Sequence, residues 1–262
     1  MLPIIKKKEL FNILILTILI IVINVQPLVV NASVIGISSS VEKYRMEYVT
    51  QNYIEEETEH FVFRYMPADK DIINMIKSNS EKRYGELVKV FGYQPKEKIL
   101  IIVFPKMDLM NEALRIPTGQ KSMGIYYSGF ISIVSPKEWE QARNEKEFIE
   151  IFNYSGPILH ELTHYFVDIR TNGNYPAWFT EGVALYLEKQ LSGFEWGEGV
   201  KYNIAPYTVY ELAQNFEGLD CDYAYRRSYE IISEYVKANG LQSLLDTMDK
   251  LGEGYSIDYL IK

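Results

Sequence analysis

Two histidines and a glutamate in the middle of the chain have the spacing of a metal site. Residues 160–164 read HELTH, an HExxH pattern. On an α-helix, at about 100° per residue, His160 and His164 point the same way and stand roughly 6 Å apart, so both imidazoles can reach one ion. Glu161 lies further round the helix, too far to be a ligand but well placed to contact a water molecule held by the ion. The pattern therefore predicts a Zn2+ site with a glutamate beside it.

A catalytic zinc site needs three protein ligands and one open position, so a third donor must come from elsewhere. The chain has only three histidines, and His60 lies far upstream. Glu181 is the best candidate, because it and His164 stand at similar distances from the turn between two consecutive helices. Asp168, one turn after His164, and Glu188 are the alternative ligands. Glu188 could instead orient a ligand histidine, although we favour an exposed helix charge for it.

The residues around HELTH define the two helices that must position these groups. We expect the first helix over residues 155–170, with Ser155 as its N-cap and Pro157 in its first turn. Residues 172–174, Asn-Gly-Asn, end this helix, and Pro176 opens the next one.

The segment after HELTH reads WFTEGVALYLE over residues 178–188. Together the two segments resemble the gluzincin clan of zinc metallopeptidases. Trp178, Glu181 and Gly182 match the W-x-x-E-G setting of the aminopeptidase N families in that clan. The whole layout is most similar to small secreted bacterial domains called minigluzincins or peptidase MA-like proteins. The metzincin pattern is not matched, because it requires Gly at position 167 and His at position 170, where this chain has Val167 and Arg170.

This resemblance implies a role for each residue of the motif. His160, His164 and Glu181 would bind Zn2+, and Glu161 would be the general base. The family also places a tyrosine in a Y-x-x-S context to stabilise the oxyanion, which Tyr225 fits.

Tyr225 has competing interpretations in this chain. It is one of 21 tyrosines, and Tyr223 and Tyr229 flank it. Any of the three could face the zinc, and plain core packing is the alternative for Tyr225.

The region before HELTH has the pattern of a small sheet. Residues 59–65 alternate between polar and apolar side chains, which predicts a strand and makes His60 an ordinary strand residue. Residues 99–104 form an unbroken apolar run, as in a central strand. Residues 124–134 indicate a hairpin with Ser128-Gly129 at its turn. Helices are expected at residues 68–91, 147–153, 209–216, 222–238 and 241–250, with a short helix or loop at 106–116.

The sequence thus predicts an α+β fold. We expect a zincin-type architecture with a small mixed sheet and helices in an upper lobe, an all-helical lower lobe, and an active-site cleft between them. The resemblance implies that an edge strand just before HELTH binds the substrate backbone. Residues 123–127 lack the glutamate of the aminopeptidase G-x-M-E-N motif, which favours cleavage within chains.

Composition and the N-terminus indicate the compartment. The 262 residues carry a formal charge of −8 and are 47% hydrophobic, which suits one domain. We do not expect nucleic-acid binding, because the sequence does not indicate a clustered basic surface. Three lysines and then an apolar stretch predict a signal peptide over residues 1–32, or an uncleaved anchor that would be the only contact with a membrane. Residues 33–56 would be a linker or short pro-segment, and residues 57–262 the catalytic domain. Cys221, the only cysteine, is expected to be buried.

The functional expectation is an extracytoplasmic zinc metallopeptidase that hydrolyses peptide bonds in a peptide or protein substrate. The alternative is a non-catalytic, zinc-bound module at the cell surface that binds or senses another molecule.

Overall fold

The computed structural model describes residues 41–116, 122–139 and 144–257. The chain separates into two units at Val41, and the fold below is that of the second unit, Glu42–Lys262. The predicted signal peptide, residues 1–32, and the first part of the predicted linker lie outside the described residues. No helix within the described ranges has both the length and the apolar character needed to cross a bilayer.

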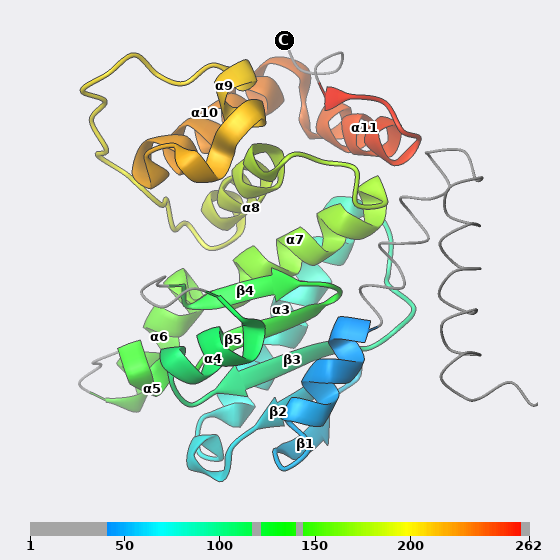
Figure 1. Cartoon of the computed structure of the whole chain (residues 1–262), viewed down its shortest axis with the longest axis vertical. Helices are drawn as coiled ribbons and strands as arrows, with labels where there is room; N and C mark the ends of the chain where they lie inside the picture. Colours follow the sequence, from blue (N-terminus) through cyan, green and yellow to red (C-terminus); the bar gives the residue numbers. More distant parts are fainter. Residues whose placement is uncertain (1–40, 117–121, 140–143, 258–262) are drawn as a thin grey trace, which may run out of the picture. The chain divides into compact units, whose positions relative to one another are not determined.

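A five-stranded mixed sheet forms one part of the domain (Figure 1). Its strands follow the order β1-β2-β3-β5-β4. The three inner strands run parallel, and the two outer ones pair antiparallel with their neighbours. The bounds are β1 (Ile54–Glu57), β2 (Phe61–Tyr65), β3 (Ile99–Phe104), β4 (Gly124–Tyr127) and β5 (Phe130–Val134). The domain therefore begins before residue 57, because β1 already belongs to the sheet.

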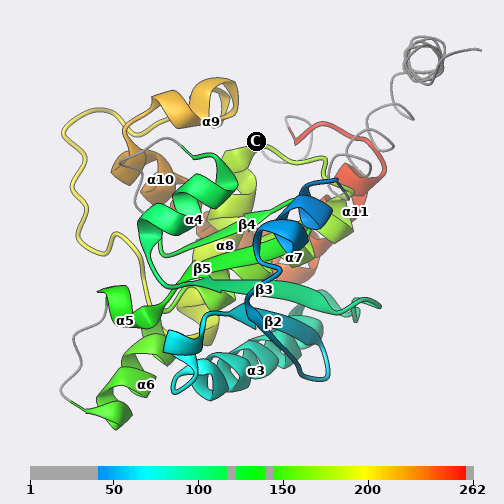
Figure 2. The ribbon, with the colours of Figure 1, turned by 60° about the horizontal axis from the view of Figure 1, so that its bottom comes forward.

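Helices cover both faces of this sheet, which explains the unbroken apolar run of β3. Alternate residues of β3 enter two separate hydrophobic clusters. The larger cluster packs against α3 (Ile73–Phe91) and α7 (Ile158–Thr171). The smaller one packs against α4 (Met107–Leu114) and helical residues 42–49, through Met110 and Met46. Figure 2 shows α3 and α4 on opposite sides of the sheet.

The hairpin between β4 and β5 is confirmed. Ser128 and Gly129 both have positive φ, 51° and 84°, which is the backbone of a tight two-residue hairpin turn. Among the described strands β4 pairs only with β5, so it forms one edge of the sheet. This edge strand lies beside α7 (Figure 1).

After β5 the described residues contain helices and connecting segments and no further strand. The helical prediction for this part of the chain is confirmed. Cys221 is exposed at the first position of α10, so its predicted burial is wrong. The helices are α5 (Pro136–Trp139), α6 (Glu145–Ser155), α7, α8 (Ala177–Leu191), α9 (Val209–Asn215), α10 (Cys221–Asn239) and α11 (Leu241–Gly252).

Candidate metal centre

The HELTH residues lie on α7, which starts later than predicted. Ser155 is the last residue of α6, where its hydroxyl donates to the carbonyl of Ile151, and is not an N-cap. α7 starts after Pro157 because Gly156 adopts an extended conformation and separates the two helices. The predicted end is confirmed: Asn172 caps α7 in the left-handed conformation, with φ 51°.

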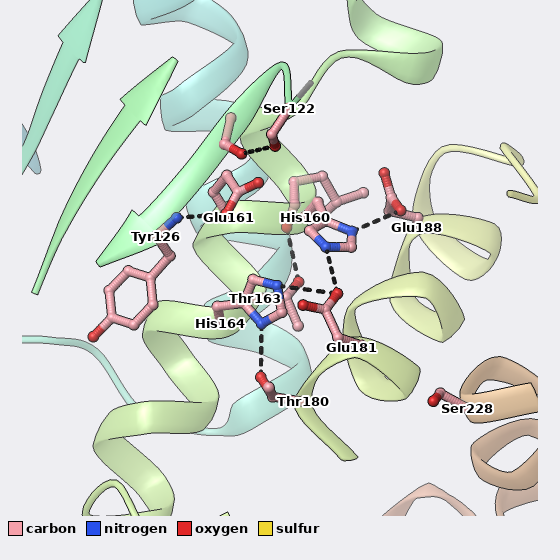
Figure 3. Close-up of polar contacts among 12 residues, drawn as sticks. Ser122, Tyr126, His160, Glu161, Thr163, His164, Thr180, Glu181, Glu188 and Ser228 are labelled. Carbon is pink, nitrogen blue, oxygen red and sulfur yellow. Dashed lines mark hydrogen bonds and ion pairs between the residues drawn. The ribbon is translucent and has the colours of Figure 1, made fainter. Parts of the chain in front are cut away.

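The turn between α7 and α8 brings two imidazoles and one carboxylate together, as predicted. His160 Nε2 lies 3.1 Å from Glu181 Oε2, and His164 Nε2 lies 3.6 Å from the same oxygen. One ligand atom from each of the three residues lies within 4.8 Å of the others. Figure 3 shows the three side chains converging from the two helices. We call His160, His164 and Glu181 the candidate metal centre.

The spacing of this centre fits a small divalent ion. Ligand atoms at 2.0–2.1 Å from a tetrahedral zinc are separated by about 3.3 Å, and the two measured Nε2 to Oε2 distances bracket that value. Two neutral imidazoles and one carboxylate are also a donor set that zinc accepts in catalytic sites. The residues therefore fit a zinc ion.

The charges around the candidate metal centre favour a proton on His160, one of the three groups that would bind the ion. Burial opposes a charged His160, but the negative charge of Glu188 and hydrogen bonds to Glu181 and Glu188 raise the pKa of His160 well above its usual value. Burial likewise opposes ionisation of Glu181, but the charge of His164 and hydrogen bonds to both imidazoles lower the pKa of Glu181. Metal binding must therefore displace a proton.

Each imidazole also has a partner on its second nitrogen. His160 Nδ1 lies 3.0 Å from Glu188 Oε2, and His164 Nδ1 lies 2.6 Å from the hydroxyl of Thr180. These bonds leave both Nε2 atoms directed at Glu181. Glu188 is only 6% exposed, so our interpretation of it as an exposed helix charge was wrong, and the alternative that it orients a histidine is confirmed in geometry. Sequence reasoning missed Thr180, although its place next to Glu181 on α8 was a usable signal.

The other candidate ligands lie elsewhere. Asp168 accepts hydrogen bonds from the hydroxyls of Tyr126 and Tyr175 and does not join the centre. His60 lies just before β2 and not within it as predicted, and it is hydrogen-bonded to Glu81 and is not part of the candidate metal centre.

Glu161 faces the edge strand β4 (Figure 3). Its Oε2 accepts a hydrogen bond of 2.6 Å from the backbone N–H of Tyr126. Burial raises the pKa of Glu161, while the charges of the two neighbouring histidines act in the opposite direction. Strand and helix approach closely here, since a Cβ at Gly124 would lie 2.7 Å from Pro157 Cβ and 2.9 Å from Glu161 Cγ. Gly124 thus allows the strand to reach the general-base candidate.

Tyr225 reaches the centre from α10. Burial raises the pKa of Tyr225, and the charge of Glu181 raises it further, so its hydroxyl stays protonated beside that carboxylate. Its ring packs against Trp196 and against Phe216, with centroid distances of 5.6 and 5.3 Å. Gly182 permits this approach, because a Cβ there would lie only 2.5 Å from the backbone oxygen of Ser228 on α10.

The two neighbouring tyrosines have other partners. Tyr223 packs against Tyr202, and Tyr229 lies under the guanidinium of Arg226. Of the three tyrosines that could face the metal, Tyr225 is the one whose pKa is raised by the charge of Glu181, a residue of the candidate metal centre.

Neither a scan against protein-family models nor a search of the curated proteins finds a match to this chain. The functional argument therefore depends on the residues of the site.

Proposed function

We propose that this chain is a zinc-dependent metallopeptidase of the gluzincin type, with a zincin-type fold. The observation that carries the proposal is the convergence of His160, His164 and Glu181 from two consecutive helices, with Glu161 beside them. The apolar N-terminal segment supports a location outside the cytoplasm. Residues 123–127 contain no glutamate, which supports cleavage within peptide chains.

Four side chains besides the three ligands of the candidate metal centre have roles in the proposed reaction. A zinc ion held by the centre would lower the pKa of a water molecule to about 7 and polarise the substrate carbonyl. Glu161 would accept the proton as the water oxygen attacks the carbonyl carbon, and then donate it to the leaving nitrogen as the C–N bond breaks. Tyr225 would donate a hydrogen bond to the developing oxyanion. Glu188 and Thr180 would keep the imidazoles oriented.

The test is Glu161→Gln, assayed with a diverse peptide library in the presence and absence of a chelator. We expect the wild-type protein to cleave peptides only without chelator, and Glu161→Gln to retain one zinc ion and lose cleavage. Glu150→Gln, which removes an exposed carboxylate from α6, is the matched control and should behave as wild type. Undiminished turnover in Glu161→Gln would refute the assigned base. A zinc-loaded wild-type protein that cleaves nothing would refute the peptidase and favour a zinc-bound binding module.

A further inference from the structure

One residue of the edge strand β4 contacts α7 at two separate points. The backbone N–H of Tyr126 donates to Glu161 Oε2 at 2.6 Å, and its side-chain hydroxyl donates to Asp168 Oδ2, also at 2.6 Å. Glu161 and Asp168 are seven residues apart, which places them two turns apart on the same face of α7. Figure 3 shows the backbone nitrogen of Tyr126 directed at Glu161 while its ring extends along α7.

The carboxylate of Asp168 is fixed by hydrogen bonds from more than one residue. Its other oxygen, Oδ1, accepts a hydrogen bond of 3.1 Å from Tyr175, so the carboxylate has two phenol donors. Burial raises the pKa of Tyr126 and of Tyr175, and the charge of Asp168 raises both further. Both phenols therefore stay protonated, and hydrogen bonds from them to a carboxylate are of the stronger, charge-assisted kind. The ring of Tyr126 also packs edge-on against Tyr165, with centroids 6.0 Å apart.

Among the strands that the structure describes, none pairs with the outer edge of β4. Within the described part of the chain the strand pairs only with β5, and the backbone N–H of Tyr126 is directed away from that pairing to Glu161 on α7. The distance from β4 to α7 is therefore set by the close approach at Gly124 and by the two hydrogen bonds of Tyr126.

We propose that Asp168 is a positioning residue for the proposed peptidase reaction. Through the phenol of Tyr126 it fixes β4 against α7, and through the backbone amide of the same tyrosine it holds the carboxylate of Glu161 in the orientation needed for proton transfer. Asp168 itself contacts neither the metal centre nor the reacting atoms. This inference rests on the proposed function.

The test compares Tyr126→Phe and Asp168→Asn with the wild type, using zinc-loaded full-length protein and one cleaved peptide. We expect unchanged zinc content, a kcat lowered by roughly tenfold, and a KM within about twofold of wild type, since a misplaced catalytic group slows the chemical step. Tyr93→Phe is the matched control. It removes another phenol hydrogen bond to α7, of 2.6 Å to the carbonyl of Phe166, without touching β4, and should leave kcat unchanged.

A kcat equal to wild type in Tyr126→Phe would overturn the inference, as would an equal loss in Tyr93→Phe. If the wild type cleaves no peptide, the proposed function fails, and the positioning contact is judged by amide hydrogen exchange over residues 122–128. Faster exchange in Tyr126→Phe than in Tyr93→Phe supports the contact, and equal exchange overturns it. Tyr126→Phe keeps the packed ring, so the test does not depend on the folding of Asp168→Asn.

Discussion

The second nitrogen of each imidazole is bonded to a different kind of partner. His160 has the buried carboxylate of Glu188, and His164 has the hydroxyl of Thr180. A carboxylate partner both orients the ring and makes it a stronger donor to a metal. We therefore expect the loss of Glu188 and the loss of Thr180 to weaken zinc binding by different amounts.

Glu188→Ala should weaken zinc binding by tenfold to a hundredfold, the usual cost of losing such a partner. Glu188→Gln should lose less, because its amide oxygen can still accept a hydrogen bond from His160 Nδ1. Competition with a chromophoric chelator measures both affinities. Glu195→Gln alters a carboxylate just after α8 that pairs with Arg226, and serves as a control with unchanged zinc affinity. Equal affinities in wild type and Glu188→Ala would show that the contact does not tune the site.

Tyr225→Phe should retain zinc and lower kcat by about a hundredfold, the typical cost of removing one oxyanion donor. Tyr223→Phe and Tyr229→Phe remove phenols with the same chemistry on the same helix, and both should keep wild-type kcat because their rings pack elsewhere. Steady-state kinetics with one peptide measures all three. A loss in Tyr229→Phe and none in Tyr225→Phe would move the role to the other tyrosine.

Two glycines let separate elements approach the centre, and neither role was visible in the sequence. Gly124 brings β4 to Glu161, and Gly182 brings α10 to α8. Helical spacing predicted the positions of His160 and His164, because those depend on local geometry. Close approaches between elements distant in the chain depend on tertiary packing, which one sequence does not display.

Gly182→Ala tests one of these approaches. Its Cβ would meet backbone of α10 at 2.5 Å, so the helices must separate, and overpacking of this kind costs about 1–3 kcal/mol of stability. The displacement should also move Tyr225 from Glu181 and lower kcat. Gly85→Ala, inside α3 with nothing within 4 Å of the added Cβ, should stabilise by about 0.5–1 kcal/mol. Urea unfolding measures both, and equal effects would contradict the packing argument.

The predicted helix start at Ser155 failed for a related reason. A serine two residues before a proline has the local signature of a helix beginning, yet Ser155 also ends the apolar pattern of α6. Ser155 can therefore be assigned either to the end of α6 or to the start of α7. The local sequence allows both assignments, and tertiary packing decides between them. The burial of Glu188 likewise could not be predicted without knowing its partner, His160. A glutamate on a helix is usually exposed unless another group pairs with it.

The domain starts earlier than the sequence analysis predicted. The composition of β1 did not indicate that it is a strand. Its three glutamates give it the composition of a linker, but each pairs with a cation on β2, on α3 or just before β3. Glu55 contacts Arg64, Glu56 contacts Lys77, and Glu57 contacts Lys98. An edge strand with one exposed face can carry such charges, so composition did not reveal it.

Zinc should stabilise the whole domain, and by more at higher pH. The single cysteine allows no intrachain disulfide, which leaves packing and the metal. The raised pKa of His160 means that the metal-free fold gains stability from the protonated imidazole at low pH and loses it as pH rises through that pKa. The ion needs the neutral ring, so zinc affinity increases over the same range, and zinc at 1,000 times Kd adds about 4 kcal/mol.

Thermal unfolding with zinc and with chelator, at pH 6 and pH 8, measures this coupling. The difference in Tm between the two conditions should be larger at pH 8, and added reductant should leave it unchanged. Glu181→Ala supplies the control, because it removes one ligand of the candidate metal centre and should abolish the zinc-dependent shift at both pH values. A shift that is the same at both pH values would mean that His160 does not release a proton when the ion binds. A shift that survives in Glu181→Ala would place the ion at a different set of ligands.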